Sequence, residues 1–142
     1  MATYTKKELE NLIKEGGLRV TPHRFLVLDT ITKYKMPIAV HELVETLQKK
    51  YAIDQATIYR NLSSLYEVGI LRRLDFNHGH AHYELSTGRA SYQFVCTKCE
   101  TFEKVEGVTI DDAVKKMLKK SKKFKQISTY SLEIYGLCRS CI

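Results

Sequence analysis

The chain lacks the features that would place it in a membrane or beyond one. No apolar run approaches the ~20 residues of a membrane-spanning helix, and polar residues 5–8 stand where a secretory leader would become apolar. There are no internal repeats and no low-complexity tracts. With 142 residues, 44% hydrophobic and 27% charged, the composition is that of a soluble globular protein of one domain or two small ones. We therefore expect a cytoplasmic protein without a membrane partner.

Cysteine is absent from the first 95 residues, and all four cysteines form two Cys-x-x-Cys pairs near the C-terminus: Cys96 with Cys99, and Cys138 with Cys141. Disulfides are not expected in a reducing cytoplasm. The spacing is typical of knuckles that each supply two thiolates to a tetrahedral zinc ion. A redox-active dithiol is the alternative. We predict one structural zinc site made by all four cysteines.

The net charge of +7 suggests a polyanionic partner, but its location weakens that interpretation. Seven lysines lie between Lys115 and Lys125, and six of them fall within one expected helix. A lysine-rich helical face is more often a solvated surface than a nucleic-acid contact. Charge alone therefore does not indicate DNA binding.

Three of the five histidines lie within five residues, at His78, His80 and His82, and Glu84 follows. Alternate positions of a strand share one face, and imidazole and carboxylate groups on one face are ligands for divalent metals. Same-face neighbours are about 6–7 Å apart, so one strand cannot place all four on one ion. Gly79 indicates a hairpin turn with His78 at its tip. The better-aligned set is then His80, His82 and Glu84.

The remaining ligands of such a site must come from elsewhere, and His41, at the start of an expected helix, is one candidate. Nitrogen and oxygen ligands suit zinc, ferrous iron, manganese and nickel alike, so the sequence does not select among these metals. The alternative is a polar strand face turned to solvent, with His41 an ordinary surface residue.

The first 85 residues read as helices followed by a β-hairpin, which predicts a winged helix-turn-helix. Helix starts are indicated by capping residues at Thr5, Thr21 and Asp54. The expected helices span 5–15, 22–35, 39–50 and the segment between Asp54 and Gly69, and the expected strands span 70–75 and 80–85.

The fourth helix is the expected recognition helix. Its apolar stripe is Ile58, Leu62 and Leu65, and the candidate DNA contacts on its other positions are Gln55, Thr57, Tyr59 and Arg60. Arginine pairs bidentately with guanine, and tyrosine contacts a thymine methyl group. The alternative is an ordinary amphipathic surface.

Residues 86–91 are small and polar and read as a hinge. Beyond them we expect strands over 92–97, 101–105 and 125–137, and a helix over 109–123 with Ile110, Val114, Met117 and Leu118 facing inward. About fifty residues cannot bury a robust core unaided. We therefore predict an α+β protein with a winged-helix DNA-binding domain (1–85), a hinge (86–91), and an α/β dimerisation domain (92–142) stapled by zinc.

Several motifs together resemble the ferric uptake regulator family: GLRVTPHR at 17–24, ATIYRNL at 56–62, YEL at 83–85, SLEIYG at 131–136, and the two cysteine pairs. The likeness covers nearly the whole chain. It implies a dimeric, metal-dependent transcription regulator in which Tyr59 and Arg60 read bases and Arg19 reaches the minor groove. It also implies that the four cysteines hold structural zinc.

The regulatory positions of the family match poorly. The usual histidine-rich run before the first cysteine pair is replaced by residues 90–93, and other ligand positions carry Pro37, Lys104 and Tyr130. Only Glu84 matches a common ligand position. The sensing site is thus either rebuilt around the wing histidines or lost.

Our preferred interpretation is a homodimeric, metal-responsive repressor that binds an inverted-repeat operator in double-stranded DNA, with no small-molecule substrate. A zinc-stabilised DNA-binding regulator without a corepressor metal, or one responding to another signal, is the first alternative. A zinc hydrolase with Glu84 as its base is a remote one, because no substrate-pocket signature is present.

Overall fold

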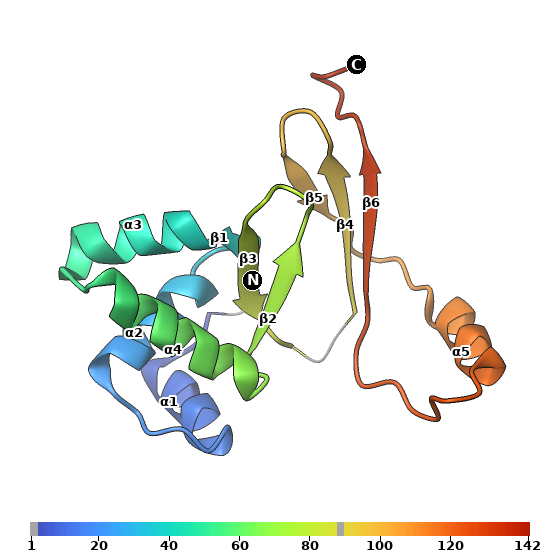
Figure 1. Ribbon diagram of the computed structural model, residues 1–142. Coiled ribbons are helices and arrows are strands. Elements are labelled where there is room, and N and C mark those ends of the chain that lie inside the picture. Colours follow the sequence, from blue (N-terminus) through green and yellow to red (C-terminus); the bar gives the residue numbers. More distant parts are fainter. Residues whose placement is uncertain (1–2, 88–89) are drawn as a thin grey trace. The chain divides into compact units, whose positions relative to one another are not determined.

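The computed structural model describes residues 3–87 and 90–142, which fold as two compact units, residues 1–86 and 87–142 (Figure 1). Each unit has its own three-stranded sheet. Two residues of the predicted hinge, Gly88 and Arg89, lie outside the described residues, and Ser91 is already the first residue of a strand.

The first unit contains α1 (Lys6–Glu15), α2 (Pro22–Thr32), α3 (Val40–Tyr51) and α4 (Gln55–Glu67). Three helices begin at the predicted caps. The Thr5 hydroxyl and the Glu8 carboxylate accept each other's backbone N–H groups, a complete capping box. Thr21 accepts the Arg24 N–H ahead of α2, and Asp54 accepts the Thr57 N–H ahead of α4.

The wing is an antiparallel pair, β2 (Leu71–Asp75) and β3 (Ala81–Leu85), to which β1 (Ile38–Ala39) adds a third strand in the order β1-β3-β2. The sequence did not indicate β1, because two residues are too few to show a period. Its pairing of Ala39 with His82 fixes the start of α3 beside the wing.

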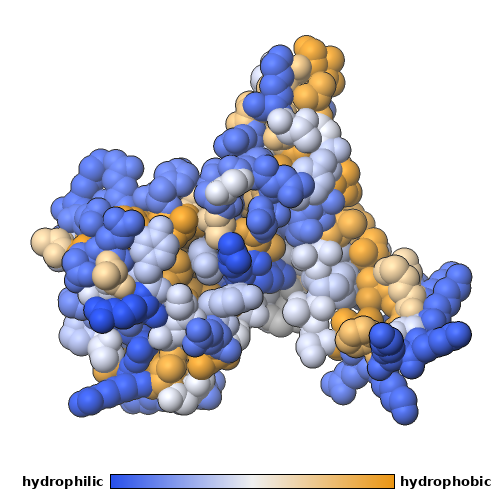
Figure 2. Space-filling view, in the orientation of Figure 1, coloured by the Kyte–Doolittle hydropathy of each residue, from blue (hydrophilic) through white to orange (hydrophobic). Residues whose placement is uncertain are grey.

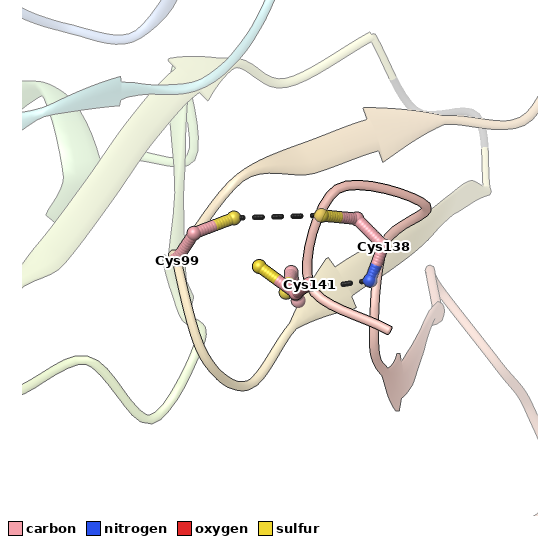
Figure 3. A group of neighbouring side chains, drawn as sticks. Cys99, Cys138 and Cys141 are labelled. Atoms are coloured by element: carbon pink, nitrogen blue, oxygen red, sulfur yellow. Dashed lines mark hydrogen bonds between the residues drawn. The ribbon is translucent and has the colours of Figure 1, made fainter.

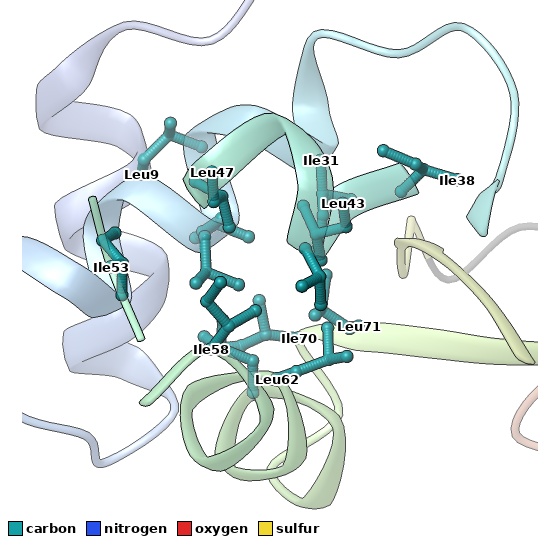
Figure 4. Close-up of a cluster of buried hydrophobic side chains, with 14 of the residues drawn as sticks. Leu9, Ile31, Ile38, Leu43, Leu47, Ile53, Ile58, Leu62, Ile70 and Leu71 are labelled. Carbon is teal, nitrogen blue, oxygen red and sulfur yellow. The ribbon is translucent and has the colours of Figure 1, made fainter. Parts of the chain in front are cut away.

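The core of this unit is made by the apolar faces of all four helices and by residues of β1, β2 and the loops, seen in Figure 4 as converging leucine and isoleucine side chains. The predicted stripe of α4 is confirmed, since Ile58, Leu62 and Leu65 are at most 1% exposed. Burying each such side chain contributes about 1.5–3 kcal/mol. Because this stripe packs into the core, the opposite side of α4 faces outward.

The second unit contains β4 (Ser91–Cys96), β5 (Phe102–Lys104), α5 (Asp111–Lys120) and β6 (Ser131–Gly136). The strand order is β5-β4-β6, with β4 and β6 parallel. The predicted strand over 125–137 is too long at its start. Its first six residues are not strand because pairing with β4 begins only at Ser91 opposite Ser131.

The inward face predicted for the last helix is only partly right. Val114 is buried, whereas Met117 is 60% exposed. The same unit exposes Phe94, Ile134 and Leu137, and Figure 2 shows hydrophobic surface along it. Large exposed apolar patches mark interaction surfaces, so this unit alone leaves apolar area that a second chain can cover.

Candidate metal centres and nucleic-acid interface

The four cysteines converge because β4 and β6 run in parallel. Cys96 is paired with Gly136 at the ends of the two strands, so the knuckles that follow meet. All four sulfur atoms lie within 4.8 Å of one another, and those of Cys99 and Cys138 are 3.6 Å apart (Figure 3). A tetrahedral ion with zinc–sulfur bonds of 2.3 Å needs sulfur separations of about 3.8 Å. The cluster therefore fits zinc.

Backbone N–H groups already favour a thiolate at this site. Those of Cys99, Cys138 and Lys98 donate toward the Cys96 sulfur and lower the pKa of this thiol to about 6. Hydrogen bonding with neighbouring thiols, Cys138 first, raises the pKa of Cys141 to about 12. Four thiolates this close repel one another, so a bound dication is what allows all of them to be deprotonated together. The cysteines are free thiols rather than disulfides.

The wing histidines form a second cluster. Ligating nitrogens of His78, His80 and His82 lie within 4.8 Å of one another, and the ring centroids of the last two are 4.9 Å apart. His78 lies in the turn between β2 and β3, as expected, but the expectation that His80, His82 and Glu84 form the better-aligned set is wrong, because His78 takes the place of Glu84 in the group. Asn77 and Gly79 adopt left-handed backbone conformations, with φ of 60° and 76°, and the turn brings His78 back to the strand.

His82 is the most buried member of this cluster, at 4% exposed, and its ring lies 4.8 Å from that of the fully buried Phe76. Burial, followed by the charges of the His80, His78 and His41 imidazoles, lowers the pKa of His82 to about 4. The ring is therefore neutral near pH 7, which is the form that ligates metal. Within the described chain, Nε2 of His78 is buried and has no hydrogen-bond partner.

The other two predicted ligands are placed differently. Arg72 donates to the Glu84 carboxylate from the facing strand, and both side chains are largely buried, so Glu84 is not grouped with the imidazoles. His41, in the first turn of α3, lies with its ring centroid 5.0 Å from that of His80, at an interplanar angle of 84°.

On α4, the residues Gln55, Tyr59 and Arg60 are exposed, but Thr57 is mostly buried. The Arg60 guanidinium donates to the Thr57 hydroxyl at 3.1 Å, and this hydroxyl donates to Asp54 at 2.5 Å. The helix cap thus orients the arginine. Thr57 is placed to position Arg60 rather than to be a contact surface itself.

Arg19 is exposed in the loop between α1 and α2. Its backbone carbonyl accepts a hydrogen bond from the Arg24 guanidinium, which anchors the loop to the first turn of α2. Our sequence analysis assigned no role to Arg24. The signal available was its position at the third residue of a helix whose start was fixed by Thr21 and Pro22.

In the second unit, protein hydrogen bonds occupy the positions where the family usually has metal ligands. Gln93 is fully buried, and its amide donates to the Ser91 hydroxyl. The Tyr130 hydroxyl donates to the Asp111 carboxylate and lies 3.1 Å from the Tyr92 hydroxyl. The pKa of Tyr130 is raised mainly by its bond to Asp111. Only the cysteines form a metal-binding group among the described residues of this unit.

A winged helix, a four-cysteine zinc site and a cluster of imidazoles on the wing together define a class, the metal-responsive DNA-binding regulators. The chain belongs to the ferric uptake regulator family, whose model matches residues 15–135. The predicted α+β fold class is thereby confirmed. Among residues 3–87 and 90–142, no helix is both long and apolar enough to span a membrane.

Named relatives resemble the chain over nearly its whole length. The peroxide operon regulator of Bacillus subtilis (strain 168) is 27% identical over 142 residues, which cover 99% of this chain and 96% of the relative. The ferric uptake regulation protein of Legionella pneumophila is 30% identical over 131 residues, covering 91% and 95%. The crystal structure of the Vibrio cholerae ferric uptake regulator matches with a TM-score of 0.73 at 29% identity, covering 91% and 98%. The chain is accordingly a metal-responsive transcription regulator that binds DNA as a homodimer.

Proposed function

We propose that this regulator is a cytoplasmic repressor whose affinity for an inverted-repeat operator is set by a divalent metal ion at His78, His80 and His82. The observation that carries the proposal is the convergence of three imidazoles, whose ligating nitrogens all lie within 4.8 Å of one another, on the wing of a DNA-binding unit. A second ion, zinc at the four cysteines, is structural because a closed shell of four thiolates leaves no position for exchange.

The DNA-contacting surface is the exposed side of α4 together with the loop that carries Arg19. Arg60 and Tyr59 lie on the first turns of α4, which is the part of a recognition helix that enters the major groove. In a homodimer, two such helices address two half-sites related by twofold symmetry. An inverted repeat is the operator that fits this arrangement.

The metal acts through the wing turn. An ion held by all three imidazoles ties the turn, which carries His78 and His80, to His82 in β3. The ion alters DNA affinity only to the extent that it binds the DNA-competent wing more tightly, and a tenfold effect needs about 1.4 kcal/mol of such difference.

The position of Glu84 supports a regulator rather than an enzyme. A hydrolase would need a carboxylate free to act as base beside the metal. Here the Glu84 carboxylate is hydrogen-bonded to Arg72 and lies outside the imidazole group. A DNA-binding unit with an exposed, oriented arginine is also what a regulator requires.

The test is operator affinity measured with and without added divalent metal at fixed salt, on a duplex selected from a randomised pool. Wild type should bind at least about tenfold more tightly with metal, which corresponds to the coupling given above. His82→Ala should bind equally with and without metal and keep its cysteine-bound zinc. His23→Ala, which changes a histidine in the first turn of α2 and away from the wing sequence, should keep the wild-type ratio. If metal tightens operator binding by the same factor in His82→Ala and in wild type, the wing histidines are not the regulatory metal site.

A further inference from the structure

We infer that the wing site is built from imidazoles alone, that His41 of α3 is its fourth ligand, and that it selects late first-row divalent ions (Co²⁺, Ni²⁺, Cu²⁺ or Zn²⁺) over Mn²⁺ and Fe²⁺. This deepens the proposed function, on which it rests for its regulatory meaning, by naming the class of ion that the same site takes.

Two carboxylates of the wing strands, those of Glu84 and Asp75, are engaged in holding the wing together. Glu84 accepts a hydrogen bond from Arg72 across the β2–β3 pair. Asp75 accepts the backbone N–H of Asn77 at 3.0 Å and so closes the turn that carries His78. The metal-binding group that remains contains only imidazole nitrogens from three histidines.

A fourth imidazole comes from a different element. β1 pairs with β3, and Ala39, opposite His82, immediately precedes α3. His41 is the second residue of that helix, and its ring stands edge-on to His80 with centroids 5.0 Å apart. The strand pairing fixes the backbones, so rotation of the exposed His41 side chain is the movement that brings a fourth nitrogen to the ion.

The donor set determines the ion. Imidazole suits zinc, copper, nickel and iron, whereas manganese, magnesium and calcium favour carboxylate, carbonyl and water oxygens. For a site of fixed nitrogen donors, affinity rises from Mn²⁺ through Fe²⁺, Co²⁺ and Ni²⁺ to Cu²⁺ and then falls at Zn²⁺. Without a carboxylate ligand, nothing in the site offsets this order in favour of Mn²⁺.

The consequence for regulation is that the switch lies within one winged-helix unit. An ion held by His41 and the wing histidines joins the start of α3 to β3 and to the β2–β3 turn. The second unit supplies no ligand in this arrangement. Metal binding thereby stiffens the wing against the helical body that carries α4.

The test is metal binding to the full-length homodimer with zinc retained at the cysteines. Co²⁺ should add one equivalent per chain, with visible d–d absorption and no new sulfur-to-cobalt charge-transfer band. Ni²⁺ and Zn²⁺ should displace it, and a hundredfold excess of Mn²⁺ should not. His41→Ala should weaken Co²⁺ binding at least about tenfold, since loss of even an outer-shell partner costs 10–100-fold. Glu84→Gln should leave the Co²⁺ affinity unchanged.

The inference is overturned if Mn²⁺ competes on equal terms, if His41→Ala binds like wild type, or if Glu84→Gln abolishes binding in a chain that still melts cooperatively. If the single Glu84 variant does not fold, the double variant Arg72→Met with Glu84→Gln removes both charges together and should also bind Co²⁺ normally. An operator response to Mn²⁺ alone would overturn the inference and leave the proposed function standing. Selective Co²⁺ and Ni²⁺ binding with no change in operator affinity would overturn the proposed function and leave this inference standing.

Discussion

At the scale of single residues, two side chains connect local structure to function, and both are held by neighbours. His82 is neutral because it is packed against Phe76 and surrounded by other imidazoles. Arg60 is exposed but oriented, because the Thr57 hydroxyl links it to the helix cap at Asp54. Both arrangements prepare a side chain for a partner before that partner arrives.

The burial of His82 makes the stability of the metal-free wing depend on pH. Its pKa is about 4 in the folded protein, against about 6.5 for an unperturbed histidine. Between these values the unfolded chain binds more protons, so this contribution is fully present above pH 6.5 and is lost as the pH falls toward 4. Urea midpoints measured from pH 7.5 to 5 should fall more steeply for wild type than for His82→Gln. Parallel curves would show that His82 titrates normally.

The orientation of Arg60 predicts a specific defect in DNA recognition. Arg60→Ala should lose about 1–3 kcal/mol of discrimination between the operator and a scrambled duplex, because a bidentate base contact is removed. Arg19→Ala is the matched comparison. It is expected to lower the affinity for the operator and for the scrambled duplex by the same factor and to reduce the salt dependence of binding. Fluorescence anisotropy titrations at several salt concentrations measure both effects. An unchanged operator-to-scrambled ratio in Arg60→Ala would contradict the assignment of α4 as the reading helix.

At the scale of elements, the sequence predicted what depends on local chemistry. Capping at Thr5, Thr21 and Asp54 and the apolar stripe of α4 set the helices, and all are found in the structure. The hairpin pattern likewise predicted the wing. What could not be predicted depends on contacts between distant segments, such as the two-residue strand β1, which exists only by pairing with β3.

The candidate site shows the same division. The spacing of His80 and His82 predicted that their side chains lie close together, and their ring centroids are 4.9 Å apart although His80 precedes β3. The engagement of Glu84 depends on which residue faces it, and the register places Arg72 there. The position of His78 close to the other two imidazoles depends on the left-handed backbone at Asn77 and Gly79. The sequence indicates a turn at Gly79, but it does not show in which direction the turn places the His78 side chain.

The turn offers a test at this scale. Gly79 has φ of 76°, and no atom lies near the position of an added Cβ, so Gly79→Ala introduces backbone strain without a clash. The expected loss of stability is about 1–2 kcal/mol, with weaker metal binding because His78 is displaced. Asn77→Gly, at a neighbouring left-handed position, should instead keep or raise stability. Thermal melts and Co²⁺ titrations of both variants measure this, and a Gly79→Ala protein that matches wild type in both would contradict the turn's role.

At the scale of the whole molecule, the two metal sites have separate tasks. The second unit holds a three-stranded sheet, one helix and much exposed apolar surface, so zinc at the cysteines and the partner chain together stabilise it. The wing site belongs to the first unit. In the proposed function, one ion supports the dimer, and the other adjusts the parts that contact DNA.

The zinc site predicts a structural defect that is distinct from a sensing defect. Cys141→Ser should lose the tightly bound zinc and shift the protein from dimer toward monomer, because the ends of β4 and β6 are no longer tied. Zinc analysis combined with sedimentation velocity measures both changes. His80→Ala is the control, expected to keep the zinc and the dimer. A Cys141→Ser protein that stays dimeric and equally heat-stable would show that this site is not structural.

The central claim is that metal at the wing histidines and DNA at α4 are energetically coupled, and coupling between two binding sites is reciprocal. The most direct measurement is the affinity of the histidine site for Ni²⁺, determined by titration of the zinc-loaded dimer alone and in complex with operator. Because the homodimer has two such sites, the product of the affinity ratios at the two sites should equal the factor by which Ni²⁺ tightens operator binding, at least about tenfold. His82→Ala should show neither effect. An affinity for Ni²⁺ that operator DNA leaves unchanged would contradict the account.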